Sequence, residues 1–370
     1  MTGQRVLIVG AGPVGLAAAL AFRSVGLRPL VADGRARGAA RGDARAIALA
    51  HGSRQILDRL GVWPHLAATP IGTVMVSQEG GFGRARIEAR DHGIDALGHV
   101  VRLGPLVEAL AAEADRRGIE VRHDSPVGAT ASIDGGVRAA VGADAVDCAL
   151  LVRAEGSPGP GADVRDYGQT ALVTEVEPRD AADARAWERF TAEGPLALLP
   201  LERGFSVVWC MRPPRADALM QASDAAFLGA LSAATGFTPY RWTAVAPRHA
   251  FPLTLARRRA DAVGAREVAI GNASQMLHPV AGQGLNLGLR DAFELALALR
   301  DGIDGSSLHA WQRRRAGDRN ATVAVTDAYV SLFSNQIAPL RAARGAGLAL
   351  VDTLPWLRTL IARRMMFGSR

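Results

Sequence analysis

Apolar runs of strand length alternate with helix-like stretches in the N-terminal part of the chain. Residues 6–9 form a short apolar run typical of a buried strand, and the alanine-rich stretch 16–22 after it has the pattern of a helix. Residues 29–32 predict a second strand, and residues 53–60 and 103–117 predict further helices that end at glycines. This alternation predicts an α/β fold.

The rest of the chain is richer in strand patterns. Strands are predicted at residues 119–122, 137–141, 146–152, 171–176, 196–199, 205–210 and 266–270, and residues 71–94 are β-prone. Because β-rich segments interrupt an α/β framework, we expect a discontinuous dinucleotide-binding domain with an inserted β-sheet domain. The first domain would comprise residues 1–68, 99–166 and 258–335, the second residues 69–98 and 167–257, and a helical segment would complete the chain at 336–370.

A glycine turn links the first predicted strand to the first predicted helix. Gly10 permits the tight turn, Gly12 lets the backbone approach a pyrophosphate, and Gly15 lets the helix press on the sheet. Pro13 suits the first helical turn, where its missing N–H is not needed. Asp33 follows the second strand at the spacing expected for a carboxylate on an adenosine ribose. Together these features predict dinucleotide binding, without distinguishing NAD from FAD.

A second glycine-rich motif, residues 271–291, distinguishes the two dinucleotides. Asn272 follows a predicted strand and is suited to bond a ribityl or phosphate oxygen, and Pro279 lies in a rigid turn that can flank a flat ring. The start of the next predicted helix exposes backbone N–H groups at Gly282, Gln283, Gly284, Leu285 and Asn286. A helix N-terminus aimed at an isoalloxazine ring stabilises the negative charge of a reduced flavin. A loop that only caps a helix does not explain the whole run, so the motif predicts FAD.

Composition excludes several other classes of protein. All 43 basic residues are arginines spread along the chain without a clustered stripe, so we expect no nucleic-acid binding despite the net charge of +7. Cys148 and Cys210 form no Cys-x-x-Cys pair, and we predict no metal site. The first strand begins too early for a secretion signal, and no stretch is apolar enough to span a bilayer, so we expect a cytoplasmic protein.

Four segments carry a resemblance to a known family. Residues 10–15, 43–49, 166–169 and 271–291 are similar to the single-component FAD-dependent aromatic hydroxylases, and specifically to those of ubiquinone biosynthesis. Within that group, Gly-Asn followed by residues 275–279 resembles the branch that acts on 2-polyprenyl-6-methoxyphenol. The resemblance covers nearly the whole chain. It implies that the discontinuous domain is a Rossmann-like FAD-binding domain and that the inserted β-sheet forms a substrate domain.

Carried over to this chain, the resemblance implies a set of cofactor contacts. The ADP half of FAD would be held by Gly10, Gly12, Gly15 and Asp33. Arg45 would reach the phosphate or ribose region, although a surface arginine is a competing interpretation in so arginine-rich a chain. Asn272 would bind the ribityl chain, and Pro279 with residues 282–286 the flavin ring. His278 is either a catalytic base or a structural residue before proline, and no other side chain is assigned to catalysis because the cofactor carries the chemistry.

One segment departs from the family. Where the family has Asp-Gly followed by Ser and Arg, this chain has Glu155 and Gly156, and the segment up to Tyr167 is shortened. Glu155 keeps a carboxylate and stays among the predicted cofactor residues, and Arg165 is a candidate replacement for the missing arginine. The departure puts efficient reduction of the flavin in question.

The resemblance also implies a reaction and its partners. FAD would be reduced by NAD(P)H and react with dioxygen to a flavin C4a-hydroperoxide, which transfers oxygen to the ring of a polyprenylated phenol. That ring would lie against strands around residues 196–200 and 207–210. The partners would be this substrate and other proteins of a quinone-biosynthesis complex. Residues 348–367 mix apolar residues with arginines, which suits either a helix peripheral to the inner membrane or a terminal helix packed on its own domain.

Three alternative functions stay open. The same chemistry on a small soluble aromatic compound needs no change in the cofactor motifs. A degenerate member that serves as an FAD-binding scaffold would account for the altered segment at Glu155. A plain NAD dehydrogenase is the weakest alternative, because it leaves the second glycine-rich motif without a purpose.

Overall fold

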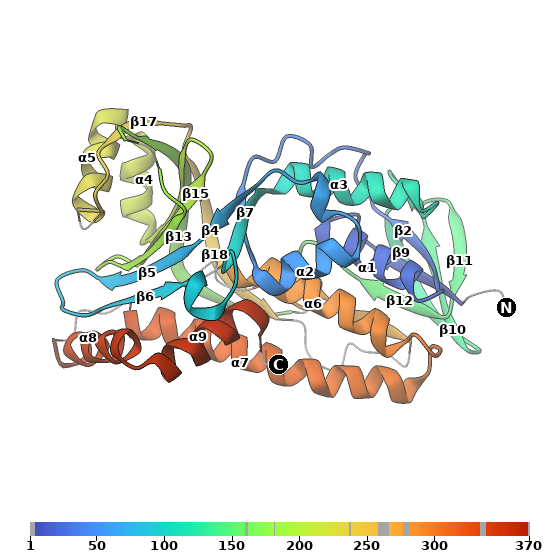
Figure 1. The fold of residues 1–370 in the computed structure, drawn as a ribbon. Coiled ribbons are helices and arrows are strands. Elements are labelled where there is room, and N and C mark those ends of the chain that lie inside the picture. Colours follow the sequence, from blue (N-terminus) through green and yellow to red (C-terminus); the bar gives the residue numbers. More distant parts are fainter. Residues whose placement is uncertain are drawn as a thin grey trace.

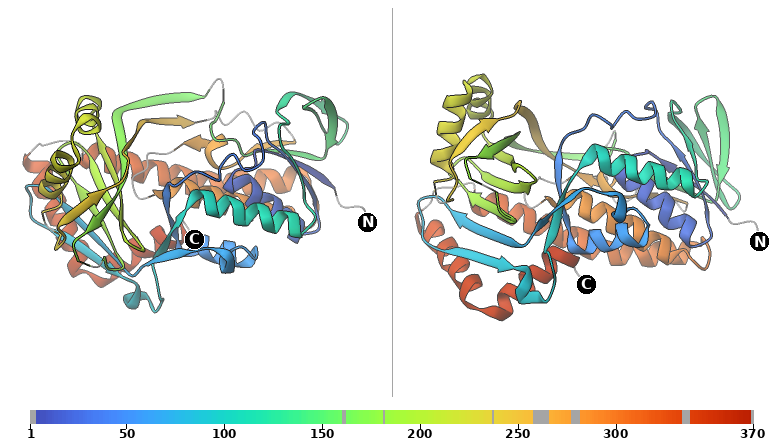
Figure 2. Two further views of the ribbon diagram at one scale, coloured as in Figure 1. Left: turned by 90° about the horizontal axis from the view of Figure 1, so that it is seen from above. Right: turned by 45° about the horizontal axis from the view of Figure 1, so that its top comes forward.

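Two sheets dominate the fold, with helices packed against them (Figures 1 and 2). The computed structural model describes residues 4–159, 162–180, 182–236, 238–257, 266–276, 282–333 and 338–368. The C-terminal helices, coloured orange to red in Figure 1, run along both parts of the molecule. The α/β class predicted from the sequence is confirmed.

The first sheet is parallel and is covered on both faces. Its strands, in spatial order, are β19 (Glu267–Ala269), β12 (Leu150–Arg153), β1 (Arg5–Val9), β2 (Arg28–Ala32) and β8 (Glu120–Arg122). One face packs on α1 (Pro13–Ser24), α3 (Leu103–Arg116) and α6 (Gln283–Ala298). The other face packs on a small sheet of β9 (Val127–Ile133), β10 (Gly136–Val141) and β11 (Asp144–Cys148). Because both faces are buried, the strands are continuously apolar rather than alternating.

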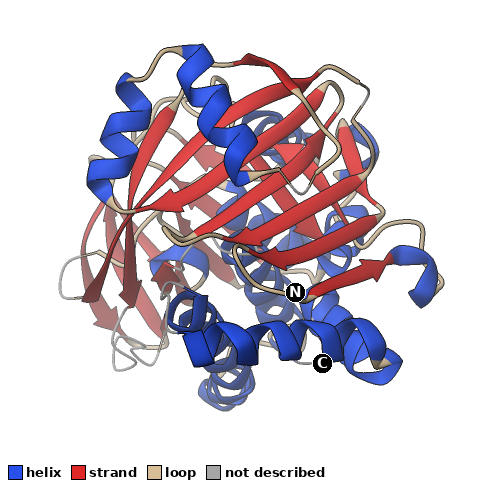
Figure 3. Cartoon of the chain, turned by 90° about the vertical axis from the view of Figure 1, so that its left-hand side faces the viewer, coloured by secondary structure: helices blue, strands red, loops and turns tan. Residues whose placement is uncertain are grey.

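The second sheet has nine strands and is mainly antiparallel. Along its length it contains β20 (Gln275–Met276), β18 (His249–Arg257), β13 (Asp163–Pro178), β16 (Gly204–Met211), β15 (Pro195–Leu201), β14 (Arg185–Phe190), β5 (Thr73–Gln78) and β6 (Arg84–Glu88), with β17 (Trp242–Val245) paired to β13. Helices α4 (Pro213–Gln221) and α5 (Asp224–Ala234) cover one face (Figure 3). Trp187, Phe205 and Trp209 fill the core beneath these helices, so the other face is left for the rest of the molecule.

A three-stranded sheet joins the two parts. It consists of β3 (Ala46–Ala50), β7 (Gly98–Arg102) and β4 (Ala68–Ile71), and it leads into α2 (His51–Arg59). Ala46 and Ala48 of β3 pack in one apolar cluster with Ala186 and Leu199 of the nine-stranded sheet. This cluster fixes the open face of the large sheet against the parallel-sheet part.

Three long helices complete the chain. They are α7 (Gly305–Phe333), α8 (Ala338–Thr353) and α9 (Pro355–Phe367), which pack on α6, on β6 and on α2, respectively. A buried ion-pair network holds α7 to α6: Asp291 lies 2.7 Å from the guanidinium of Arg315 and 2.9 Å from that of Arg319. Arg315 also pairs with Asp318 at 2.8 Å. Each of these buried charges has an opposite charge beside it, which offsets the cost of removing it from water.

Most predicted strands and helices are confirmed, with one exception. Residues 146–152 were expected to form one strand, but Ala149 separates β11 from β12, and the two strands belong to different sheets. The prediction was wrong because the residues on both sides of Ala149 are mostly apolar, so the sequence pattern does not mark where the first strand ends and the second begins. The sequence did not indicate several elements, namely β3, β4, β7, β9, β14, β17, β18, β20, α4, α5 and α7.

The pH dependence of stability tests the packing of the joining sheet. Burial, together with the nearby charges of Arg54 and His51, lowers the pKa of His99 to about 4, and its Nδ1 has no partner among the described residues. The unfolded chain binds a proton at a higher pH than the folded protein does. The free energy of unfolding should therefore fall as the pH drops from about 6.5 to about 4.

Urea unfolding of the His99→Gln variant across this pH range should show a flatter dependence. The exposed His65 serves as the control, because His65→Gln should keep the wild-type slope. An unchanged slope in His99→Gln would contradict the lowered pKa of this half-buried histidine.

Candidate functional site

The predicted cofactor residues gather at one edge of the parallel sheet. Asn272 follows β19, Glu155 follows β12, Gly10 follows β1 and Asp33 follows β2. Since these four strands are parallel neighbours in that order, their carboxyl ends place the four residues in a row, which is where ligands bind in open α/β sheets. The row covers three steps between strands, roughly 14 Å. One extended ligand can therefore contact all four positions.

The first glycine turn combines close packing with open space. A Cβ on Gly15 would collide with the carbonyl oxygen of Gly10, and Gly10 itself has φ +105°. A Cβ on Gly12, in contrast, meets nothing within 4 Å. Pro13 is the first residue of α1, and no side chain caps this helix N-terminus. The open backbone at Gly12 and the uncapped N–H groups behind it fit a pyrophosphate.

Asp33 fastens the end of β2 to this turn. Its Oδ2 accepts a hydrogen bond from the backbone N–H of Ala11 at 2.7 Å, and its Oδ1 accepts one from the backbone N–H of Arg35 at 2.8 Å. Burial raises the pKa of Asp33, but the hydrogen bonds from Arg35 and Ala11 outweigh it and lower the pKa to about 2. Asp33 is therefore ionised at neutral pH. Its salt bridge with Arg35, which the sequence did not indicate, competes with a ribose hydroxyl for the carboxylate.

A second uncapped helix N-terminus lies at the β19 end of the row. Gly282 caps α6 with φ +58°, no side chain caps this end, and Gln283 is the first helical residue. The side chain of the exposed Asn272 lies beside this end, because its Oδ1 is 4.0 Å from the Cβ position of Gly284. Leu285 packs on the core behind the helix start. Donor N–H groups and an amide therefore face the same space.

Asn286 has a different position from the other residues of this motif. It is 1% exposed; its Nδ2 donates to the carbonyl oxygens of Ala48 at 2.9 Å and Gly282 at 2.8 Å, and its Oδ1 accepts from the N–H of Ala50 at 2.8 Å. The amide thus ties Gly282, at the start of α6, to β3. We assign it to positioning this helix start rather than to direct contact with the flavin ring predicted from the sequence.

The two glycine motifs meet at one contact. A Cβ on Gly288 would lie 2.6 Å from Cγ2 of Val14 and 3.1 Å from the Cα of Gly271. Gly271 has φ +58°, and its own Cβ would lie 3.2 Å from Val14. Only glycine allows α1, α6 and the end of β19 to approach so closely. The sequence motif contained Gly288, but its pattern did not reveal Val14 as the partner.

Glu155 lies between the two helix N-termini. Its Oε1 accepts a hydrogen bond from Arg153 at 3.0 Å, and its backbone N is 3.3 Å from the Cβ position of Gly10. Its Oε2 is buried and has no partner among the described residues. A buried carboxylate oxygen without a donor fits a ligand that supplies one, such as a hydroxyl group. The segment that departs from the family therefore still provides a ligand acceptor.

Two of the remaining predicted residues, Arg45 and Arg165, have partners of their own. The guanidinium of Arg45 binds Asp43 at 2.6 Å, so it must leave this partner before it can reach a phosphate. The guanidinium of Arg165 lies 5.9 Å from the ring centre of Tyr167. Both His278 and Pro279 fall outside the described residues.

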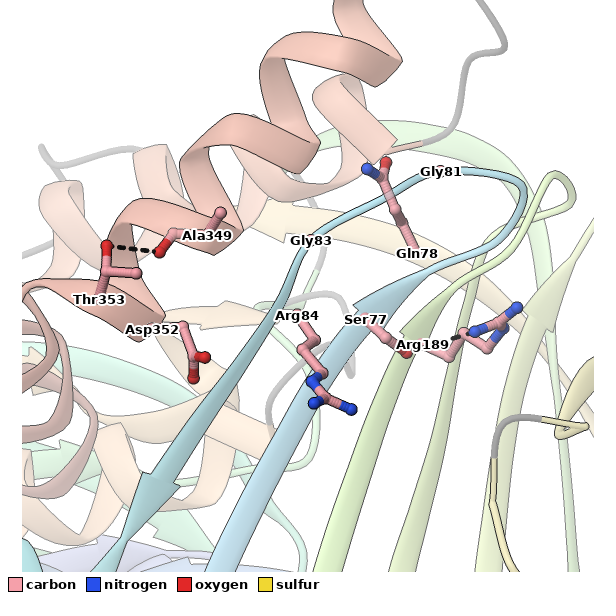
Figure 4. Close-up of a pocket in the computed structure, with 9 residues that line it drawn as sticks. All are labelled: Ser77, Gln78, Gly81, Gly83, Arg84, Arg189, Ala349, Asp352 and Thr353. Carbon is pink, nitrogen blue, oxygen red and sulfur yellow. Dashed lines mark hydrogen bonds between the residues drawn. The ribbon is translucent and has the colours of Figure 1, made fainter.

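A separate hollow of about 410 Å³ lies at the other end of the molecule, where the β5–β6 edge meets α8 (Figure 4). Three of its nine lining residues are charged, namely Arg84, Arg189 and Asp352. Arg189 reaches the hydroxyl of Ser77 at 3.4 Å. None of the predicted cofactor residues lines this hollow, so it is not part of the row described above.

Comparison with known sequences gives consistent matches. The model of a family described as an FAD binding domain matches residues 4–314. The chain is 34% identical to ubiquinone hydroxylase UbiL of Rhodospirillum rubrum, over 98% of this chain and 89% of that protein. It is 28% identical to 3-demethoxyubiquinol 3-hydroxylase of Escherichia coli, over 95% and 96%. Neither name is that of the 2-polyprenyl-6-methoxyphenol branch, so the choice of branch remains a prediction.

Comparison with solved structures agrees on the fold. The p-nitrophenol 4-monooxygenase PnpA of Pseudomonas putida matches with a TM-score of 0.75 at 18% identity, covering 100% of this chain and 99% of that one. A variant of HpxO from Klebsiella pneumoniae, solved with FAD, matches with a TM-score of 0.77 at 17% identity, covering 99% of each chain. At these identities the likeness shows the fold, and the aromatic-hydroxylase fold implied by the sequence is confirmed.

Two glycine substitutions should separate folding from ligand binding. Gly15→Ala should destabilise the protein by about 1–3 kcal/mol or more, because its methyl group collides with Gly10. Gly12→Ala should keep the wild-type melting temperature, since its methyl group meets no protein atom, yet weaken FAD binding about tenfold or more by obstructing the pyrophosphate.

Thermal unfolding and titration of flavin fluorescence measure the two effects. Gly229→Ala in α5, where a Cβ also meets nothing, is the control for both measurements. Wild-type FAD affinity in Gly12→Ala would place the pyrophosphate elsewhere.

Proposed function

This chain belongs to the FAD-binding-domain family as a flavin-dependent monooxygenase, and from that premise we propose that it hydroxylates the aromatic ring of a polyprenylated phenol in ubiquinone biosynthesis. The observation that carries the proposal is the row from Asn272 to Asp33, with two uncapped helix N-termini facing it. An NAD dehydrogenase would use only the half of this row near Gly12. The second helix N-terminus and the orphaned oxygen of Glu155 support a longer ligand with a second ring system.

The residues present fit FAD. We assign the pyrophosphate to the open turn at Gly12, a hydroxyl-bearing chain to Glu155 and Asn272, and the flavin ring to the start of α6. Bound FAD supplies the redox and oxygen chemistry that side chains lack, with NAD(P)H as the proposed reductant. The sequence contains one Gly-x-Gly-x-x-Gly, which favours a transient encounter with NAD(P)H over a second resident nucleotide.

The protein's own contribution is to hold the ring and exclude water. We propose that FAD binds to the part built on the parallel sheet and the substrate to the open face of the nine-stranded sheet, following the domain division expected from the sequence. Val173, Val208 and Leu199 contribute apolar side chains to that face. An apolar wall suits a prenylated aromatic ring and keeps water from the reacting atoms.

Turnover with a prenylated phenol tests this function. The purified protein, loaded with FAD, should consume NAD(P)H and dioxygen faster when the phenol is added, and mass spectrometry should find a product heavier by one oxygen atom. Gly12→Ala, assayed at limiting FAD, should lose most of this turnover because it holds less cofactor.

Other outcomes identify the alternatives. Turnover with small aromatic acids but not with prenylated phenols would favour a soluble substrate. Flavin retention without turnover of any phenol would favour a scaffold, and a protein that cannot be reconstituted with FAD would contradict the proposal.

The C-terminal helix α9 offers a surface for reaching a lipid-soluble substrate. Its buried side, with Ala362 and Met366, packs against Ile87 of β6. Its other side exposes Trp356 by 65% and Leu360 by 59%, four residues apart on one helical face. No helix in the described ranges is long and apolar enough to cross a membrane. We propose a peripheral contact through this exposed face.

Vesicle flotation tests the membrane contact. The wild type should float with vesicles that contain anionic lipids, and Trp356→Ser/Leu360→Ser should bind them at least about a hundredfold more weakly, because each buried apolar side chain adds about 1.5–3 kcal/mol to partitioning. The double variant should keep its turnover of a short-chain phenol in solution. Equal flotation of both proteins would remove this surface from the proposal.

A further inference from the structure

Glu188 is an acidic residue whose neighbours across the adjacent strands are apolar. It lies on β14 between Val76 of β5 and Ala197 of β15. Side chains alternate between the two faces along a strand, and the adjacent Trp187 belongs to the core beneath α4 and α5. Glu188 therefore lies on the opposite face, the face proposed to bind the substrate. The next strand continues the same row with Val208.

The surroundings of Glu188 connect it to the cofactor site. Two residues away on the same face, Ala186 packs in a cluster with Ala48 of β3. The carbonyl oxygen of Ala48 accepts the hydrogen bond from Asn286 at the start of α6. Glu188 is thus connected through Ala186 and Ala48 to the start of α6, the helix N-terminus assigned to the flavin ring. On its other side the face continues with Val208 and Cys210.

The carboxyl group of Glu188 has no partner within the part of the chain that the structure describes. No hydrogen bond or ion pair reaches it, and its direct neighbours on the adjacent strands are not ionisable. Burial raises its pKa to about 8, so it is mainly neutral at pH 7. The titratable group coupled to Glu188 is the Cys210 thiol of β16. Burial raises the pKa of this thiol, and the negative charge of an ionised Glu188 raises it further.

This combination describes a partly exposed carboxyl group rather than one enclosed in a packed core. Glu188 keeps part of its surface accessible, although it is deep enough in the protein to lose most of its hydration. A carboxyl group left without a hydrogen bond in such a place destabilises the fold. A ligand that offers a polar atom on an apolar body removes that cost, and a phenol has this chemistry.

We propose that Glu188 recognises the phenol substrate by exchanging a hydrogen bond with the hydroxyl group on its ring. A neutral carboxyl group can donate one hydrogen bond and accept another, so it matches a hydroxyl group in either direction. This one polar contact, together with the apolar wall, holds the substrate ring in a fixed position relative to the cofactor. This role rests on the proposed function and makes Glu188 a determinant of specificity.

Two variants test the proposal in the FAD-loaded enzyme. Glu188→Leu should raise KM for a prenylated phenol about tenfold, the effect of about one lost hydrogen bond, while FAD affinity stays unchanged. It should also lose the preference for the phenol over its methyl ether. Glu188→Gln keeps the ability to donate and accept, so its KM should stay near the wild-type value. Glu202→Leu, at an exposed position in the β15–β16 turn, is the matched control and should leave every value unchanged.

The pH dependence of stability reports on the carboxyl group independently of turnover. Because the folded pKa of Glu188 is raised above its unfolded value, its contribution to stability is complete below about pH 4.5 and is lost as the pH rises toward 8. Glu188→Gln should remove this fall. Glu188→Leu should be at least as stable as the wild type at pH 8, so a change in its KM is not a sign of misfolding.

The outcomes separate this inference from the function it rests on. An active wild type whose KM and choice of substrate are unchanged in Glu188→Leu would overturn the role of Glu188 alone. A wild type that oxidises no phenol would overturn the proposed function and this inference with it. A raised KM in Glu188→Leu with recovery in Glu188→Gln would support both.

Discussion

The site depends on one close contact between three elements, where the side chain of Val14 in α1 meets the backbones of Gly271 and Gly288. A methyl group at Gly288 would lie 2.6 Å from Val14, so no larger residue fits without moving a helix. This contact brings the start of α1 and the start of α6 to the same edge of the parallel sheet, although the two helices are far apart in the sequence. Each helix then directs its partial positive charge at the same row of residues.

Other interactions keep this arrangement in place. Asn286 ties Gly282, at the start of α6, to β3, and Asp291 near the middle of α6 is held by Arg315 and Arg319 of α7. The helix is thus fixed at its start by an amide, along its side by glycine contacts and further along by buried charges. Such support from a second layer of residues keeps a binding site rigid before its ligand arrives. The same β3 strand carries Ala48, through which the substrate wall is fixed against the cofactor part.

The sequence predicted the features that depend on local spacing. The turn from Gly10 to Gly15 and the start of α6 need particular residues at particular positions, so their patterns could be read directly. Two of the three partners of Asn286 could not be predicted, because they are backbone groups of Ala48 and Ala50, more than two hundred positions away. The engagement of Asp33 by Arg35 was also hidden, since any arginine in this chain could have served. Glu188 was missed because β14 carries charged residues at both ends and on both faces, so it shows no alternation.

A crystal structure of the protein with FAD bound would show most directly whether the two glycine motifs form one binding site. We expect one extended FAD molecule along the sheet edge, with its pyrophosphate at Gly12 and its isoalloxazine ring at Gly282–Gly284. Oε2 of Glu155, which has no partner among the described residues, should accept a hydrogen bond from that molecule. A ring bound away from the start of α6, or a dinucleotide confined to the α1 half of the row, would contradict the claim that the two glycine motifs form one site.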